Sequence, residues 1–337
     1  MYSDAAITFP IFGDNFIINI PRYVQIHGFS LYLYGFLITA GFILAGLYCY
    51  KRRNVLGLTQ DNIFDIIIIS VPCGLIGARI YYILFNAADY FGPGKWHNMF
   101  MLRQGGLAVY GGIIASGIVF LVYSRIKKVP VGKLLDAAGF GLFIGQAVGR
   151  WGNFVNREAF GVGTDVPWKM GFINEAQHRT DYYHPAFLYE SLWNVVGLLI
   201  MHIFSKKSKT KYPGQYFLFY VAWYGFGRFM IEGLRTDSLI ISGTDIRVSQ
   251  LLAALSFSVA VILLVRNFLR GYTSDFETKQ PSLKPVLAMA GVEDLLAEDL
   301  LSEDLDDADD MAGGTASPDI PPNEDADDNN DGDAPDE

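Results

Sequence analysis

Seven apolar stretches recur along this 337-residue chain, and each approaches the length that crosses a lipid bilayer. A spanning helix needs about 20 mostly apolar residues, and its backbone polar groups must be satisfied within the segment. The stretches cover about residues 29–50, 63–85, 106–123, 134–149, 185–205, 214–232 and 248–268. Hydrophobic residues make up 51% of the chain, which is typical of a multi-span membrane protein. We therefore predict an all-α integral membrane protein with about seven transmembrane helices.

Basic residues gather in alternate loops and indicate the orientation. The segments after the first, third, fifth and seventh stretches carry 15 of the 26 Lys and Arg: Lys51, Arg52, Arg53, Arg125, Lys127, Lys128, Lys133, Lys206, Lys207, Lys209, Lys211, Arg266, Arg270, Lys279 and Lys284. Cytoplasmic loops of membrane proteins carry such an excess. The pattern predicts an N-terminus outside, a C-terminus in the cytoplasm and an outer position for residues 150–184.

The last part of the chain has a different composition. From Gly291 onward there are 19 Asp or Glu and no Lys or Arg, whereas the net charge of the whole chain is −9. A segment this charged buries too little apolar surface to offset the entropy of ordering. We predict a transmembrane domain over residues 1–273 and a disordered acidic cytoplasmic tail over residues 274–337.

Charged residues inside or beside the apolar stretches are candidates for function. A charge at the centre of a span costs about 2.5 kcal/mol or more, so each should face a partner or a cavity. The set comprises Asp65, Arg79, Asp136, Arg150, Glu158, Glu190, Arg228, Glu232 and Arg235. Arg247, just before the last stretch, fits an interfacial anchor.

The densest cluster is 149-GRWGNFVNREAFG-161. The guanidinium fork of Arg150 suits a phosphate, and Asn153 and Asn156 add neutral donors. Glu158 could accept a proton or hold the arginine. An arginine reaching toward the headgroups beside a plain turn would explain Arg150 alone, but the whole cluster favours a binding site.

Two further clusters follow. In 183-YHPAFLYE-190, His184 precedes Glu190 by six residues. In 225-GFGRFMIEGLRTDS-238, Arg228, Glu232 and Arg235 share one helical face, as either an ion-pair staple or an anion site.

Tyr34 and Tyr110 are phenols beside glycines; singly, each is typical of interfacial tyrosines. The two cysteines, Cys49 and Cys73, are too few for a disulfide framework or a metal site. The sequence also lacks a phosphate-cradling loop and a nucleophile elbow, so we expect no cofactor, no metal and no nucleic-acid partner.

Basic residues at headgroup depth favour an anionic lipid substrate. A membrane transporter or channel for an anionic or lipid-like solute is the alternative, and a purely structural bundle is a second one. A transporter favours ionisable residues near the midplane and repeated halves, whereas here the charges lie toward the outer ends and no repeat is evident.

Together these stretches make the chain resemble the prolipoprotein diacylglyceryl transferases of the bacterial inner membrane. The 149–161 motif is the most specific match. The supporting matches, in the same order as in the family, are 34-YG-35, 77-GARIYYILF-85, 104-QGGLAVYGG-112, 184-HPAFLYE-190, 228-RFMIEGLRTD-237 and 247-RVSQ-250.

The resemblance implies transfer of the diacylglyceryl group of phosphatidylglycerol to the thiol of the lipobox cysteine in a prolipoprotein signal peptide, with release of glycerol phosphate. It implies that Arg150 binds the lipid phosphate, with Asn153, Asn156 and Glu158 completing the pocket, and that Arg235 shares the charge of the leaving group. Tyr34 matches the tyrosine of the first-span motif. Glu190, Arg228 and Glu232 are expected to support the substrate site.

The resemblance leaves the general base open. Some members have a histidine where this chain has Tyr110, and an unperturbed tyrosine, with a pKa near 10, is a poor base at neutral pH. Either that histidine is not the universal base, or Glu158, Glu190 or His184 serves instead.

Overall fold

The computed structural model describes residues 5–13, 15–27, 29–91, 95–101, 105–174, 178–207, 212–236 and 247–270. The predicted acidic tail, residues 274–337, lies outside these residues. The described chain is mostly helical, as predicted. Its long helices are α1 (Leu33–Leu56), α2 (Gln60–Phe85), α4 (Val109–Ile126), α5 (Val131–Asn156), α6 (Ala186–Lys207), α7 (Gln215–Glu232) and α8 (Val248–Leu269).

Six of these helices are long and apolar enough to cross a membrane: α1, α2, α4, α5, α6 and α8. The chain is therefore an integral membrane protein. Helix α7 lies where the sixth apolar stretch is predicted but is not among the six. It carries Arg228 and Glu232 near its end, and it packs between α5 and α8.

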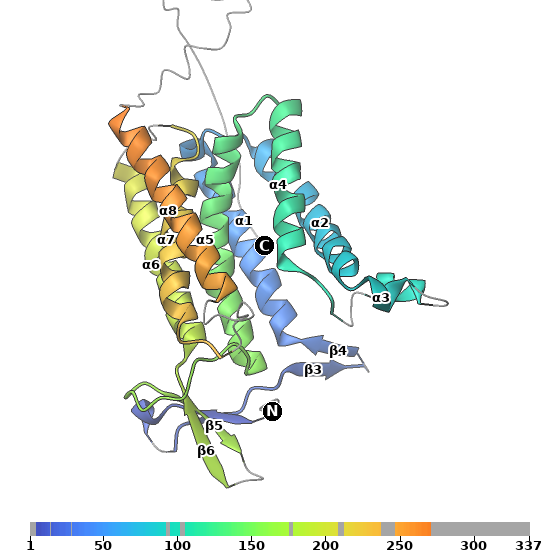
Figure 1. Ribbon diagram of the computed structural model, residues 1–337, viewed down its shortest axis with the longest axis vertical. Helices are drawn as coiled ribbons and strands as arrows, with labels where there is room; N and C mark the ends of the chain where they lie inside the picture. Colours follow the sequence, from blue (N-terminus) through green and yellow to red (C-terminus); the bar gives the residue numbers. More distant parts are fainter. Residues whose placement is uncertain are drawn as a thin grey trace, which may run out of the picture. The chain divides into compact units, whose positions relative to one another are not determined.

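Helix α5 is the centre of the bundle and packs against α1, α6 and α7 (Figure 1). Its buried face carries Phe140 and Phe143, which are fully buried against neighbours that include Tyr216, Tyr220 and Met201. Asp136 on the same helix is buried and accepts the backbone N–H groups of Gly214 (2.8 Å) and Phe217 (2.9 Å) at the start of α7. This carboxylate inside the bundle is thus a helix cap, which explains how it is tolerated there.

Helices α2 and α4 form a separate pair, standing beside α1 in Figure 1. Gly77 and Gly111 let the two backbones touch: a Cβ added at Gly77 would lie 2.7 Å from the Gly111 oxygen. Small residues at such crossings allow the close packing that holds helices together in lipid. Arg79, two residues further along α2, is buried and donates to the carbonyls of Asn98, Met99, Gly105 and Gly106. It therefore fixes the segment that leads into α4.

Short strands, which the sequence does not predict, lie at one end of the helices (Figure 1). Strands β1 (Ala6–Thr8), β2 (Ile17–Ile18), β5 (Met170–Asn174) and β6 (Arg179–Tyr183) form an antiparallel sheet in the order β2-β1-β5-β6. Strands β3 (Tyr23–Ile26) and β4 (Phe29–Tyr32) form a hairpin, so residues 29–32 are strand where a helix is predicted. The remaining short elements are α3 (Ala87–Tyr90) and the 3₁₀ helices η1 (Pro10–Phe12) and η2 (Trp96–Phe100).

The sheet is attached to the helices by its own apolar core. Ile7 of β1 pairs with Phe172 of β5, and both side chains are fully buried. They pack with Phe154 at the end of α5 and Phe187 at the start of α6. The sheet therefore fixes the ends of the two helices that carry the polar motifs.

Candidate functional site

The 149–161 motif begins inside helix α5 and ends beyond it. The sequence predicts that the fourth apolar stretch ends near residue 149, but α5 continues to Asn156, so Arg150 and Asn153 occupy successive turns of one helix. The chain then reverses at Arg157 and Ala159, whose φ angles are 54° and 55°. The turn therefore rests on two residues in the left-handed region, and neither is one of the motif's glycines.

Gly152 has a different function, which is close packing. Tyr34, in the first turn of α1, lays its ring on this glycine, and a Cβ there would lie 2.5 Å from the ring carbon Cδ2. Tyr34 lies within electrostatic range of Glu158 and Arg150. The structure thus brings the predicted tyrosine of the first span to the edge of the motif.

Glu158 is held by neutral amides. Its Oε1 accepts from Asn153 Nδ2 at 3.0 Å and from Asn156 Nδ2 at 3.3 Å, and Asn153 Oδ1 accepts from Arg150 Nη1 at 3.3 Å. The side chain is solvent-exposed, and its second oxygen has no partner among the described residues. Glu158 is therefore a fixed carboxylate with one free oxygen.

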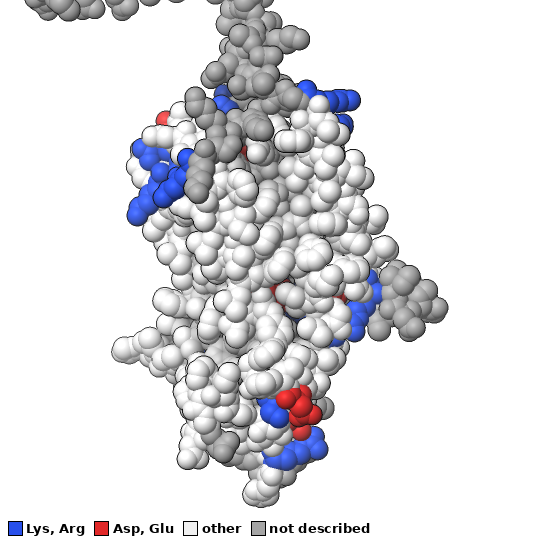
Figure 2. All heavy atoms as spheres, turned by 90° about the vertical axis from the view of Figure 1, so that its left-hand side faces the viewer, with Lys and Arg blue, Asp and Glu red and all other residues white. Residues whose placement is uncertain are grey.

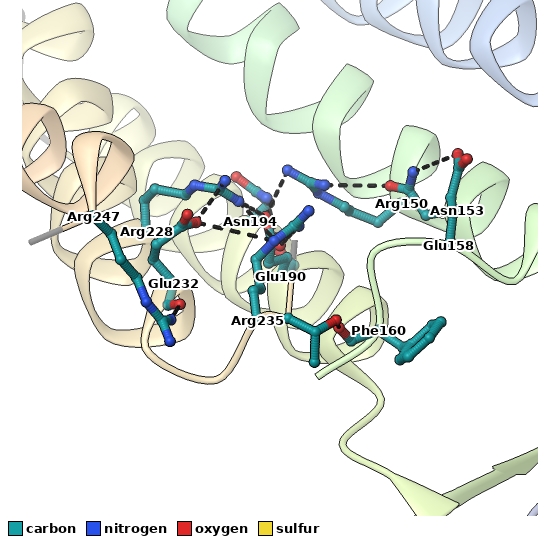
Figure 3. A network of polar contacts seen from close by, with 11 residues as sticks. Arg150, Asn153, Glu158, Phe160, Glu190, Asn194, Arg228, Glu232, Arg235 and Arg247 are labelled. Atoms are coloured by element: carbon teal, nitrogen blue, oxygen red, sulfur yellow. Dashed lines mark hydrogen bonds and ion pairs between the residues drawn. The ribbon is translucent and has the colours of Figure 1, made fainter. Parts of the chain in front are cut away.

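Glu190 of α6 is the centre of the network, and three arginines from different parts of the chain converge on it (Figure 3). Its Oε2 lies 2.6 Å from Arg150 Nη2, and its Oε1 lies 3.0 Å from Arg235 Nη1. Arg228 Nη1 lies within 3.3 Å of both oxygens. The carboxylate is 4% exposed, and arginines occupy both of its oxygens.

A second buried carboxylate, Glu232 of α7, extends the network. It lies 2.6 Å from Arg228 Nη2, as an ion pair without hydrogen-bond geometry, and 4.0 Å from Arg235 Nε. Arg247, which the sequence suggests to be an interfacial anchor, donates from Nη1 to the backbone carbonyl of Glu232. Arg228, Glu232 and Arg235 therefore form an ion-pair staple in the structure. The staple contains two arginines and one glutamate, so its net positive charge also suits the alternative use, an anion site.

The end of the motif joins the two helices that carry this network. Gly161 N donates to the His184 carbonyl at 2.9 Å, and Val162 N donates to the Leu234 carbonyl at 2.7 Å. Gly161 also forms a β-bridge with Arg235. These main-chain bonds place Arg235 over Glu190.

Two predicted residues lie apart from the network. His184 Nδ1 contacts Tyr189 Oη at 3.1 Å, and that hydroxyl accepts from Trp168 Nε1 at 2.7 Å. His184 thus reaches the site only through its backbone. Tyr110, on α4, is 52% exposed and makes no polar contact with the network among the described residues.

Sequence reasoning missed two residues of this region. Arg157 is buried and donates to the carbonyls of Ala5, Val155 and Ile20, so it is an anchor for the N-terminal segment. Asn194, one turn after Glu190, is 2% exposed and donates to the Glu190 carbonyl at 2.7 Å. Its i, i+4 spacing from Glu190 is the signal that could have found it.

The fold and this network define a multi-pass membrane protein whose buried charges gather in one arginine–carboxylate cluster at the end of the bundle that bears the sheet. Comparison with known proteins gives the family. The chain belongs to the prolipoprotein diacylglyceryl transferase family, whose match covers residues 21–266.

Relatives with assigned names agree with this family. The phosphatidylglycerol–prolipoprotein diacylglyceryl transferase of Enterococcus faecalis is 36% identical over 247 residues, which cover 72% of this chain and 88% of the relative. The protein of the same name from Streptococcus uberis is 36% identical, covering 73% of this chain and 94% of the relative. That from Listeria innocua is 38% identical over 251 residues, covering 73% and 88%.

Proposed function

We propose that this chain transfers the diacylglyceryl group of phosphatidylglycerol to the cysteine thiol of prolipoproteins, which forms a thioether and releases glycerol phosphate. The family and the names of its relatives support this function. The arginine–carboxylate network is the structural observation that carries it.

The network contains more positive than negative charge. Among the described residues, Arg150, Arg228 and Arg235 share two carboxylates, those of Glu190 and Glu232. Charge that is removed from water is costly unless it is compensated, so the excess of arginines in this described network favours binding of an anion. Arg150 is the most exposed of the three, at 20%, and its second partner is the neutral amide of Asn153. It is therefore the arginine best placed to receive a lipid phosphate.

The same arginines can stabilise the leaving group. As sulfur bonds to the glycerol carbon, the carbon–oxygen bond to phosphate breaks, and negative charge grows on the departing glycerol phosphate. Guanidinium groups already held in place stabilise this charge without reorganising during the reaction. Arg235, fixed by Glu190 and by its bridge to Gly161, is positioned for this role.

Glu158 is the group best placed to accept the thiol proton. Glu190 has both oxygens bound by arginines, and the His184 ring contacts Tyr189 rather than the network among the described residues. Glu158 keeps one oxygen free while two amides hold the other. Sulfur that is bonding to carbon becomes far more acidic than the free thiol, so the proton would move to the Glu158 carboxylate as the carbon–sulfur bond forms.

The active site would face the outside of the bacterial inner membrane, where the signal peptide's lipobox emerges. The described basic residues of the cytoplasmic loops lie at the end of the helices away from the sheet, and Figure 2 shows basic side chains there with an uncharged belt below them. The positive-inside rule supports an outer position for the opposite end.

The reaction can be tested with full-length protein in phosphatidylglycerol vesicles and a lipobox peptide. We expect a thioether-linked diacylglyceryl peptide and free glycerol phosphate, detected by mass spectrometry. Arg150→Ala should lower product formation about 100-fold or more, because it removes a charge-assisted contact to the leaving group. Asp165→Asn, at an exposed position outside the network, is the control and should leave the rate unchanged.

Normal transfer by a folded Arg150→Ala protein would rule out the phosphate role of this arginine. Solute flux through the vesicles without any lipid product would instead support a transporter.

A further inference from the structure

At the other end of the bundle, Arg52 has a single hydrogen-bond partner among the described residues. Arg52, near the end of α1, reaches across to α6, where its Nη2 donates to Ser205 Oγ. The buried Nε of Arg52 has no acceptor among the described residues, and no carboxylate pairs with the guanidinium there. The charge of this half-buried group is thus uncompensated within the described part of the protein.

Three buried arginines show what Arg52 lacks. Arg79 has four backbone carbonyls and Arg157 has three. Arg235 has the carboxylates of Glu190 and Glu232. Guanidinium donors that are removed from water require hydrogen-bond acceptors. An anionic oxygen ligand would supply acceptors that Arg52 lacks among the described residues.

The surroundings of Arg52 are rigid. Ser205 is buried and donates to the His202 carbonyl at 2.8 Å, which orients its oxygen toward the guanidinium. One turn away, Tyr48 Oη lies 2.6 Å from His202 Nδ1, which ties α1 to α6. The guanidinium is therefore held in place rather than free to follow solvent, which favours binding of a ligand by reducing the cost of ordering.

The location of Arg52 indicates the kind of ligand. Arg52 lies in the last turns of α1, flanked by Lys51 and Arg53, where membrane helices meet lipid headgroups. The same turns of α1 and α6 expose the apolar side chains of Leu47, Ile203 and Phe204. A ligand that combines a phosphate with acyl chains fits this combination of surfaces.

We propose that Arg52, positioned by Ser205, binds the phosphate of an anionic phospholipid between α1 and α6, at the end of the bundle away from the arginine–carboxylate network. No substrate turnover is assigned to this site. The proposal therefore does not depend on the transferase reaction.

The test is lipid binding by purified full-length protein, measured by native mass spectrometry and by thermal unfolding in detergent. Phosphatidylserine is the probe, because it is anionic but lacks the glycerol headgroup. We expect Arg52→Gln to bind one phosphatidylserine about tenfold more weakly than the wild type, as loss of a charge-assisted hydrogen bond predicts. Asp165→Asn, at an exposed position far from Arg52 in the sequence and outside the arginine–carboxylate network, should retain this binding.

Arg53→Gln is the matched control. It removes the same charge one residue away, but Arg53 donates to the Tyr50 carbonyl at 2.9 Å and lies over the Tyr50 ring. Its lipid binding should equal that of the wild type. Equal weakening in both variants would show that general surface charge attracts the lipid and would overturn the site.

Two further arms complete the test. Inorganic phosphate raising the unfolding temperature as much as phosphatidylserine would overturn the assignment to a lipid. If Arg52→Gln fails to fold, Arg52→Lys keeps the charge without the planar fork and should still bind the lipid more weakly. Unchanged binding by the lysine variant would contradict the proposed geometry.

Discussion

Two carboxylates of the same network have opposite surroundings at the level of single residues. Glu190 is buried and bound by arginines through both oxygens, whereas Glu158 is exposed and held through one oxygen by two amides. Glu190 is suited to holding the arginine side chains in place, and Glu158 is suited to exchanging a proton. This difference lets one substitution test positioning and another test chemistry.

Replacing Glu158 should affect the chemical step. In Glu158→Gln the side-chain carbonyl can still accept from Asn153 and Asn156, so the pocket keeps its shape while the proton acceptor is lost. We expect kcat to fall about 100-fold, as for other general bases, with KM for phosphatidylglycerol nearly unchanged. Steady-state kinetics in vesicles would measure both. An effect confined to KM would show that Glu158 only orients the lipid.

Replacing Glu190 should affect stability first. Glu190→Ala leaves Arg150, Arg228 and Arg235 with Glu232 as the single carboxylate among them. Loss of one partner from a buried charge cluster typically lowers the free energy of unfolding by about 3–5 kcal/mol. Unfolding in detergent, followed by tryptophan fluorescence, would measure this. Asp165→Ala removes an exposed carboxylate that pairs with Lys169 and is the control; equal stability of the two variants would contradict the proposed role of Glu190.

At the scale of the elements, the two helix groups are held together differently. Helix α5 contacts its neighbours through large side chains such as Phe140 and Phe143, whereas α2 and α4 meet backbone to backbone at Gly77 and Gly111. The α2–α4 pair therefore tolerates side-chain additions only where its surface is open.

A pair of alanine substitutions tests this difference. In Gly77→Ala the new Cβ would lie 2.3 Å from Ala115 Cβ, so the helices must separate. In Gly117→Ala it meets nothing within 4 Å. We expect Gly77→Ala to lose about 1–3 kcal/mol of stability, as overpacked sites do, while Gly117→Ala unfolds at the wild-type temperature. Equal unfolding temperatures for both variants would contradict the close crossing.

The sequence predicts the helices well, because the local pattern of apolar residues determines them. All seven apolar stretches correspond to helices, because about 20 apolar residues in lipid have few other conformations. Helix α5 is longer than predicted because Arg150 and Asn153 find polar partners and stay helical. The convergence on Glu190 requires the packing of α5, α6 and α7, which no local pattern contains. Strand β1 is three residues long and depends on a distant partner, so it gives no periodic signal.

For the whole molecule, the proposed orientation in the membrane can be tested. The sheet and the described basic loops lie at opposite ends of the helices, so one labelling experiment shows on which side of the membrane each end lies. In a background of Cys49→Ala and Cys73→Ala, a membrane-impermeant maleimide should label Asp165→Cys in intact spheroplasts. It should label Lys128→Cys only in inverted vesicles. The reverse pattern would place the arginine–carboxylate network on the cytoplasmic side.

The anchoring of the N-terminal segment by Arg157 has a consequence for biosynthesis. Arg157 donates to the Ala5 carbonyl across 152 positions of sequence, and β1 pairs with β5 further on still. Closing so large a loop is entropically costly and slow. During synthesis β1 therefore stays unpaired with β5 until helices α1 to α5 have been made and β5 has emerged. Because Arg157 and Glu158 are adjacent, the surroundings of the proposed proton acceptor Glu158 are completed late, after the chain has already entered the membrane.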